Sequence, residues 1–250
     1  MNKKEMTIGE LKAAYKSRTG PNLNNYSWFQ TDVCLYRQER DRVMLDLLKR
    51  AGVSDLSKLD IFEVGCGFGD NLLNLIKLGA IPNRIWASDI IGSRVKAARY
   101  RLPQSVNLFV EDSSANTSKK NCFDLIIQFT VFSSILSDQM QTELANNLMH
   151  LLREDGYILW YDFLYSNPRN VSVRGCSKVR VRELFPDAEI MVKKVTLAPP
   201  LGRGIVRRFP FLYPVLSMFP MLRTHMFALV KKKTKLNNVR LNSQSSDISF

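Results

Sequence analysis

The sequence predicts an α/β fold in which a doubly wound, parallel sheet is covered by helices on both faces. Short apolar runs alternate with helical patterns from residue 59 onward. These runs are almost continuously apolar, as expected of strands that are buried on both faces of a sheet. The first run, 60–64, ends in a glycine-rich turn, and a helical pattern follows it at once.

The predicted elements follow one another closely. Apolar runs predict strands at 60–64, 84–88, 106–110, 123–128 and 157–162, and helices lie between them at 70–79, 93–101 and 137–152. Next come a helix over 177–185, with Ser177 as N-cap, and strands at 190–197 and 226–231. Upstream, apolar residues at three-to-four spacing predict a helix over 33–51. We divide the chain into N-terminal cap helices (1–58), one domain (59–233) and a disordered tail (234–250).

The turn after the first strand has the pattern Glu63-x-Gly65-x-Gly67-x-Gly69. Glycine has no Cβ, so a ligand can lie against this backbone, and the following helix start offers free N–H groups. The dinucleotide fingerprint G-x-G-x-x-G would need its third glycine at position 70, which is Asp70. The turn therefore favours a ligand other than a dinucleotide, and an ordinary glycine turn is the alternative.

Acidic residues follow the next two strands. Asp89 ends the second strand and Asp112 follows the third. The carboxyl ends of parallel strands meet at one edge of the sheet, which is where open α/β sheets bind their ligands. A carboxylate at the position of Asp89 can accept hydrogen bonds from ribose hydroxyls. These residues therefore predict a nucleoside site beside the glycine turn.

Together these motifs resemble those of class I S-adenosylmethionine-dependent methyltransferases. The glycine turn is similar to that family's motif E/D-x-G-x-G-x-G, and Asp112-Ser113 is similar to its adenine-binding pair. Segment 123–130 resembles the fourth strand, and 151–159 resembles the L-x-P-G-G turn, although Glu154 and Asp155 replace the usual Pro-Gly. The resemblance implies a Rossmann-like, seven-stranded, mostly parallel sheet, with the seventh strand antiparallel beside the fifth.

The resemblance also implies methyltransferase activity with S-adenosyl-L-methionine as cofactor. The implied cofactor-binding residues are Glu63, Gly65, Cys66, Gly67, Gly69, Asn71, Asp89, Ile90, Asp112, Ser113, Gln128 and Phe129. A non-catalytic member that keeps the fold as a binding module is an alternative, against which the intact acids Glu63, Asp89 and Asp112 weigh.

Segments 161–170, 183–186, 197–200 and 222–225 resemble small bacterial methyltransferases that are often found among polysaccharide-biosynthesis genes. That resemblance implies a small-molecule or glycan acceptor, and a sugar hydroxyl of a cell-envelope polysaccharide is the expected target. A hydroxyl acceptor benefits from a base, for which Asp162 is the first candidate, followed by Tyr161 and His225. The alternative for Asp162 is that it anchors the next loop through backbone N–H groups.

The loop after the fifth strand carries groups that bind anions. Asn167, Arg169, Asn170 and Arg174 are the candidate substrate-binding residues, because Arg suits bidentate contact with a carboxylate or phosphate. The alternative is that these are exposed loop residues. Their expected ligand is an anionic sugar or phosphate.

The chain has 36 Lys and Arg against 23 Asp and Glu, a net charge of +13. Such a surplus favours anionic partners, so the competing function is methylation of RNA or another nucleic acid on the basic surface. No added RNA-binding module or interleaved stacking aromatics accompany the charge. Segment 128–130, Gln-Phe-Thr, also argues against methylation of an adenine amine. A nucleic-acid substrate is therefore the less favoured prediction.

Segment 198–224 is apolar, aromatic and basic, without an acidic residue. Its prolines exclude one long helix. One interpretation is a lid or a membrane-surface patch; the other is a pair of short helices packed on the sheet. The widely spaced cysteines Cys34, Cys66, Cys122 and Cys176 predict reduced thiols and no metal site. With no predicted secretory signal or membrane span, we expect a cytoplasmic protein, with the inner face of the membrane as an option.

Overall fold

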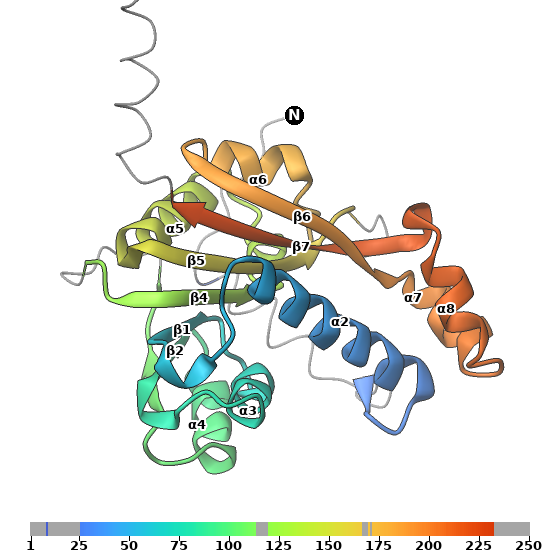
Figure 1. The fold of residues 1–250 in the computed structure, drawn as a ribbon, viewed down its shortest axis with the longest axis horizontal. Coiled ribbons are helices and arrows are strands. Elements are labelled where there is room, and N and C mark those ends of the chain that lie inside the picture. Colours follow the sequence, from blue (N-terminus) through green and yellow to red (C-terminus); the bar gives the residue numbers. More distant parts are fainter. Residues whose placement is uncertain (1–8, 10–25, 114–119, 167–169, 171, 233–250) are drawn as a thin grey trace, which may run out of the picture.

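The computed structural model describes residues 9, 26–113, 120–166, 170 and 172–232. Its seven-stranded sheet has the strand order β3-β2-β1-β4-β5-β7-β6 (Figure 1). The strands are β1 (Ile61–Val64), β2 (Ile85–Asp89), β3 (Asn107–Val110), β4 (Phe123–Phe129), β5 (Leu152–Phe163), β6 (Ala188–Leu197) and β7 (Arg223–Lys232). β1 to β5 pair in parallel, whereas β7 lies antiparallel between β5 and β6. The Rossmann-like, mostly parallel sheet is thus confirmed.

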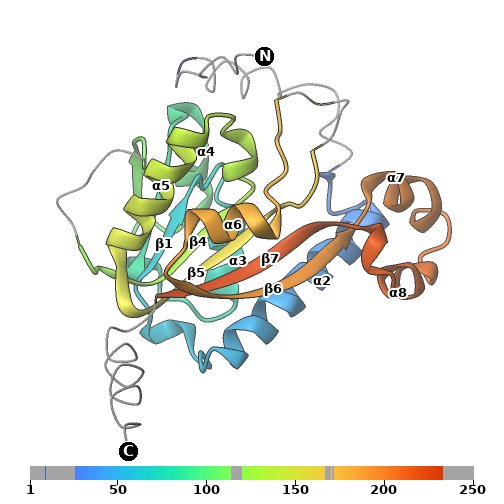
Figure 2. The same ribbon diagram turned by 90° about the horizontal axis from the view of Figure 1, so that it is seen from above.

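Helices cover both faces of the sheet (Figure 2). Side chains of α2 (Thr31–Arg50), α3 (Asp70–Lys77) and α4 (Gly92–Arg101) share a core with one face. Those of α5 (Asp138–Leu151) and α6 (Lys178–Leu184) share a core with the other. Successive side chains on a strand point to opposite faces, so Ile61 joins the first core and Phe62 the second. The near-continuous apolar strands follow from this double covering.

The short helical turns connect these elements. They are η2 (Leu56–Lys58), η3 (Pro82–Arg84) and η4 (Phe132–Ser134). The Ser177 side chain accepts a hydrogen bond from the Arg180 backbone N–H at 3.2 Å, which confirms the predicted N-cap of α6. Most strand boundaries differ from the prediction by up to three residues. The largest difference is that β5 begins at Leu152 rather than 157, because residue 152 pairs with Phe123 at the start of β4. The polar residues at 153–155 therefore continue the strand.

The insertion between β6 and β7 forms short helices, as one of its two interpretations expected. They are α7 (Pro199–Leu201), the π-helical turn η5 (Gly202–Val206), α8 (Leu212–Ser217) and η6 (Pro220–Leu222). Proline lies in the first turn of both α7 and η6, where its missing N–H costs no hydrogen bond. Val206 and Tyr213 are buried and form a small separate core with Leu197, against which Leu35 and Tyr36 of α2 pack. The insertion therefore packs on α2 and the end of β6.

The four cysteines are free thiols. Within the described ranges, no group of three or more His, Cys, Asp and Glu side chains is placed to hold a metal ion. A search of the helices in the same ranges finds none that has both the length and the apolar character of a membrane span.

Candidate functional site

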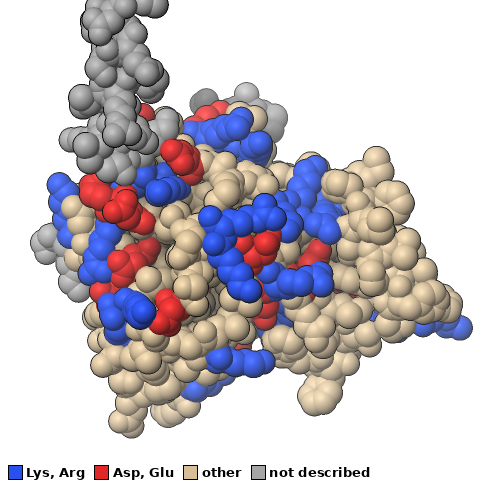
Figure 3. Space-filling model, in the orientation of Figure 1, with Lys and Arg blue, Asp and Glu red and all other residues tan. Residues whose placement is uncertain are grey.

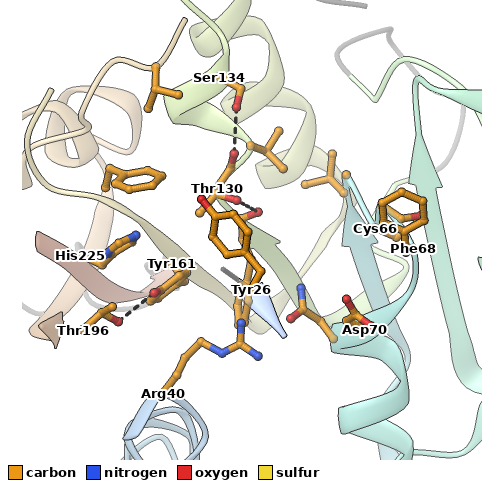
Figure 4. Close-up of a pocket in the computed structure, with 18 of the residues that line it drawn as sticks. Tyr26, Arg40, Cys66, Phe68, Asp70, Thr130, Ser134, Tyr161, Thr196 and His225 are labelled. Atoms are coloured by element: carbon orange, nitrogen blue, oxygen red, sulfur yellow. Dashed lines mark hydrogen bonds between the residues drawn. The ribbon is translucent and has the colours of Figure 1, made fainter. Parts of the chain in front are cut away.

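A cavity of about 660 Å³ lies outside the carboxyl ends of β1, β2, β4 and β5. One end, here called the turn end, is lined by the glycine turn, by Asp89 and Ile90 after β2 and by residues 111–113 after β3. The other, the ring end, is lined by Tyr161, Thr196 and His225. Figure 4 shows the two ends facing each other, with side chains of the N-terminal segment between them: Tyr26 and Arg40.

The glycine turn is built from left-handed backbone. Gly65, Gly67 and Gly69 have φ of 70°, 54° and 80°, which favour glycine. A Cβ at Gly65 would clash with Val131, and one at Gly69 would lie 2.8 Å from Leu102 Cδ1. A Cβ at Gly67 would meet no described atom within 4 Å. The outer glycines are thus required for packing, while Gly67 faces open space in which a ligand can lie against the backbone.

Asp89 holds the turn in shape. Its Oδ2 accepts a hydrogen bond from the Gly67 N–H at 2.9 Å, and its Oδ1 accepts one from the Ile91 N–H at 2.8 Å. A carboxylate has about four acceptor sites, so Asp89 keeps acceptor capacity where it lines the cavity. At the adjacent strand end, the hydroxyl of Ser113 is hydrogen-bonded to that of Ser88. Asp89 therefore lines the cavity beside the glycine turn, and its contact with a ribose stays a prediction.

Glu63 lies behind the turn, and its side chain is fully buried. Its Oε1 accepts a hydrogen bond from Asn71 Nδ2 at 2.7 Å, while its Oε2 has no partner among the described residues. Burial raises the pKa of Glu63 to about 8. Glu63 thus positions Asn71, which itself lines the cavity.

Most of the predicted cofactor-binding residues meet at the turn end. Those that line the cavity are Gly65, Cys66, Gly67, Asn71, Asp89, Ile90, Asp112, Ser113 and Phe129. Burial raises the pKa of the Cys66 thiol, which favours its neutral form. Three predicted residues do not line the cavity: Glu63, Gly69 and Gln128. Gln128 accepts a hydrogen bond from the Val131 N–H at 3.1 Å and thereby shapes the chain after β4.

Two of the three candidate catalytic residues share the ring end. The rings of Tyr161 and His225 stack with centroids 5.1 Å apart. The Tyr161 hydroxyl is hydrogen-bonded to Thr196 Oγ1 at 2.8 Å, and His225 Nδ1 to Thr224 Oγ1 at 3.0 Å. Burial raises the pKa of Tyr161 and lowers that of His225 to about 3. Both side chains are therefore neutral at physiological pH.

Asp162, the first candidate for a base, does not line the cavity. It is fully buried, and its Oδ2 and Oδ1 accept hydrogen bonds from the backbone N–H groups of Ser133 and Phe163 at 3.1 and 2.8 Å. Burial raises its pKa to about 6. Because side chains alternate along β5, Tyr161 and Asp162 point to opposite faces of the sheet. This geometry favours the alternative, that Asp162 anchors the chain.

The predicted substrate-binding residues separate. Asn170 lines the cavity. Arg174 does not; its guanidinium forms an ion pair with Asp138 of α5 at 2.6 Å. Asn167 and Arg169 lie outside the described residues.

Four arginines for which the sequence predicts no role also line the cavity: Arg37 and Arg40 of α2, Arg94 of α4 and Arg203 of the insertion. The Arg40 guanidinium lies 5.1 Å from the ring centroid of Phe129 and 5.8 Å from that of Tyr161. The Nε atoms of Arg37 and Arg40 are buried without a hydrogen-bond partner among the described residues. In the sequence, Arg37 and Arg40 belong to the basic face of the helix that became α2, and a helix on a protein surface would direct such a face to solvent.

One buried carboxylate joins the parts of the chain that enclose the ring end. Glu39 Oε2 accepts hydrogen bonds from the Thr196 N–H at 3.1 Å and from the Tyr213 hydroxyl at 2.7 Å. Its Oε1 lies 3.2 Å from a guanidinium nitrogen of Arg223. Glu39 therefore ties α2 to β6, to the insertion and to β7.

Residues 61–156 match a family described as "Methyltransferase domain". No curated protein matches the chain. Among solved structures, the chain is similar to an S-adenosylmethionine-dependent methyltransferase from Mesorhizobium loti, with 14% identity and a TM-score of 0.55 over 73% of this chain and 95% of that one. It is similar to magnesium protoporphyrin IX methyltransferase from Synechocystis PCC 6803 with bound SAH, with 13% identity and a TM-score of 0.59 over 89% and 100%.

A third similar structure is the [4+2]-cyclase SpnF, with 17% identity and a TM-score of 0.58 over 79% of this chain and 83% of that one. At such identities the likeness concerns the fold. The substrates and reactions of these neighbours differ, so they leave the acceptor of this chain open.

Proposed function

We propose that this chain, an S-adenosylmethionine-dependent methyltransferase of the class I fold with its methyltransferase domain at residues 61–156, methylates an anionic small molecule or glycan. The acceptor atom in this proposal is a sugar hydroxyl, as in a cell-envelope polysaccharide. The observation that supports it is that one cavity joins the glycine turn to a ring end with neutral polar groups and is also lined by arginines, among them Arg37, Arg40 and Arg203.

The residues of the turn end fit the cofactor. The open space over Gly67, the carboxylate of Asp89 and the polar pair Asp112-Ser113 supply backbone contact and acceptors for a nucleoside. We assign the ribose hydroxyls to Asp89 and the adenine to Asp112-Ser113. The volume of about 660 Å³ lies within the range of roughly 300–1,000 Å³ that is usual for small-molecule sites. When bound, the cofactor supplies an activated methyl group on its sulfonium.

Arg40 is suited to the carboxylate of the cofactor. Its side chain leaves α2 and points toward the middle of the cavity (Figure 4). Its Nε forms an ion pair with Asp41 Oδ1 at 3.7 Å but has no hydrogen-bond partner in the described chain, and a buried donor of this kind gains from an anion. The proposal therefore extends the cofactor site from the glycine turn to the N-terminal helix.

Arg37 and Arg203 are suited to an anionic acceptor. They reach the cavity from α2 and from the insertion, and a guanidinium can bind a carboxylate or phosphate with two hydrogen bonds. Asn170 adds a neutral polar group to the same cavity. Because Arg174 is paired with Asp138, we propose that Arg37 and Arg203 take the substrate-binding role predicted for Arg174.

His225 and Tyr161 would orient the acceptor hydroxyl. With a pKa of about 3 the imidazole of His225 is neutral at neutral pH, so its role in this proposal is to accept a hydrogen bond from the hydroxyl and to pass that proton on to water as the oxygen takes up the methyl group. Methyl transfer then depends mainly on alignment and on the exclusion of water. The hydrogen bond between the hydroxyl groups of Tyr161 and Thr196 would keep this wall rigid.

Two experiments test the proposal in sequence. Titration calorimetry with S-adenosylmethionine should show binding that Arg40→Gln and Gly67→Ala weaken. Transfer of a tritiated methyl group should then label a cell-envelope glycan fraction. Arg37→Gln should reduce this labelling, and Arg42→Gln, an exposed position on the same helix outside the cavity, should not. Labelling of RNA instead of glycan would contradict the proposed acceptor and support the nucleic-acid alternative.

We also propose that the enzyme acts in the cytoplasm, at the inner face of the membrane. The support is the basic, apolar character of segment 198–224.

A further inference from the structure

The insertion between β6 and β7 has two apolar faces, and packing accounts for only one. Its inner face is buried through Val206 and Tyr213. Six exposed apolar side chains make up what is here called the outer face: Phe209, Phe211, Val215, Met218, Phe219 and Met221. Phe211, Met218 and Met221 are 71%, 77% and 80% exposed. A cluster of large exposed apolar side chains on one element typically marks an interaction surface.

The charges around this outer face are of one sign. No acidic residue occurs between positions 190 and 246. Arg207 is paired with Asp32 at 2.6 Å and Arg223 with Glu39 at 3.2 Å, which hold the insertion on α2. Arg203 and Arg208 are exposed and form no ion pair within the described residues. Figure 3 shows this end of the molecule largely without charged side chains and without an acidic one.

The insertion also lies at one end of the molecule, beyond the paired ends of β6 and β7 (Figure 1). Its inner residues Pro199, Gly202, Arg203 and Tyr213 line the cavity. A surface that contacts the outer face is therefore separated from the acceptor region only by the thickness of the insertion. Such a contact would place the cavity beside that surface.

From these observations we propose that the outer face docks the enzyme on an anionic lipid bilayer. The exposed Phe, Met and Val side chains enter the boundary between head groups and acyl chains, and Arg208 lies at the lipid phosphates. A bilayer fits better than a protein partner because the outer face protrudes and combines apolar tips only with cations. Docking deepens the membrane location proposed above and does not depend on the identity of the acceptor, whereas the consequence that the acceptor is anchored in the bilayer rests on the proposed function.

Co-sedimentation of the full chain with vesicles tests the docking. The protein should bind phosphatidylcholine vesicles that contain phosphatidylglycerol, and added salt should weaken the binding. The triple variant Phe211→Ser/Met218→Ser/Met221→Ser should bind at least about tenfold more weakly. The control Tyr100→Ser/Val179→Ser removes apolar side chains that are 82% and 64% exposed on other helices and should bind normally. Arg208→Glu should reduce the preference for the anionic lipid.

Two results would overturn the docking proposal. One is that the wild-type protein does not bind vesicles, or that the triple variant binds them equally well, although calorimetry with S-adenosylmethionine shows that both proteins are folded. The other is dimerisation in sedimentation velocity that depends on the outer face without vesicle binding, which would assign it to a protein contact. If vesicles bind but only water-soluble glycans accept the methyl group, docking stands and the bilayer-anchored acceptor is wrong. If vesicles bind and no glycan is labelled, docking stands and the proposed function fails.

Discussion

Tyr161 and His225 stack across the adjacent strands β5 and β7, with ring planes 8° apart and centroids separated by 5.1 Å. The edge of His225 also approaches Phe163, whose ring centroid is 4.1 Å away. The imidazole is thus enclosed by aromatic rings on a wall of the cavity. This enclosure removes it from water and accounts for its lowered pKa.

Replacing His225 with Ala should lower kcat by about tenfold or more and leave the affinity for S-adenosylmethionine unchanged, because His225 lies at the ring end and is not among the residues proposed to hold the cofactor. His150→Gln alters the only other histidine, which lies outside the cavity, and should have no effect. Steady-state kinetics and calorimetry measure the two quantities. Because His225 has a pKa of about 3, the wild-type rate should show no step from this group between pH 5 and 8. An equal loss of cofactor affinity would contradict the assignment.

Asp162→Asn should destabilise the protein more than it slows methyl transfer. The carboxylate accepts hydrogen bonds from two backbone N–H groups, and an amide can accept only with its oxygen, so we expect a loss of about 1–3 kcal/mol. Thermal unfolding measures this loss. With enzyme kept folded, activity should stay within a few-fold of wild type. A fall of several orders of magnitude would restore Asp162 as the base.

Gly67→Ala should mainly weaken cofactor binding, whereas Gly69→Ala should mainly lower the stability of the protein. A Cβ at Gly67 points into open space, so the protein should fold but bind S-adenosylmethionine more weakly. A Cβ at Gly69 would crowd Leu102 at a φ of 80°, so this variant should lose roughly 1–3 kcal/mol of stability. Calorimetry and thermal unfolding separate the two outcomes. Unchanged affinity in Gly67→Ala would show that the ligand does not lie on this turn.

Glu63 should make the free protein less stable as the pH rises from 6.5 to 8. Its folded pKa of about 8 lies above the ordinary value of 4.5 for a glutamate, so the native state holds a proton that the unfolded state has released, and raising the pH favours unfolding. We expect a loss of about 1–2 kcal/mol across this interval. Asp162 and His225 have folded pKa values of about 6 and 3 and contribute little there.

The control for this pH dependence is a pair of variants. Glu63→Gln should flatten the curve, since its amide oxygen can still accept the hydrogen bond from Asn71. Glu189→Gln removes an exposed carboxyl and should leave the curve unchanged. Denaturant unfolding at several pH values measures both, and a wild-type curve that rises over this interval would contradict the buried, protonated state of Glu63.

The strands and the turn end of the cavity could be predicted from the sequence because each depends on local pattern. A parallel strand buried on both faces needs an apolar run, and its loop carries the ligand-binding residues. The same local pattern misled at Asp162. A carboxylate at a strand end is a plausible catalytic base from its position in the sequence alone. Side chains alternate between the two faces of the sheet, however, and Tyr161 rather than Asp162 faces the cavity.

The arginines at the cavity could not be assigned from pattern alone. Arg37 and Arg40 lie on the polar face of α2, which a surface helix would direct to water. Here that face covers the cavity, because the insertion packs beside the helix and closes the space. The contact between α2 and residues 199–223 joins segments far apart in the chain, and no spacing rule in either segment indicates it.

The contacts of Glu39 have a consequence for how the molecule is made. The described residues that enclose the cavity run from Tyr26 to His225, and Glu39 bonds to partners at 196, 213 and 223. During synthesis Glu39 and then the glycine turn emerge early, whereas the hydrogen-bond and ion-pair partners of Glu39 emerge late. The cavity can therefore be completed only after nearly the whole described chain has left the ribosome.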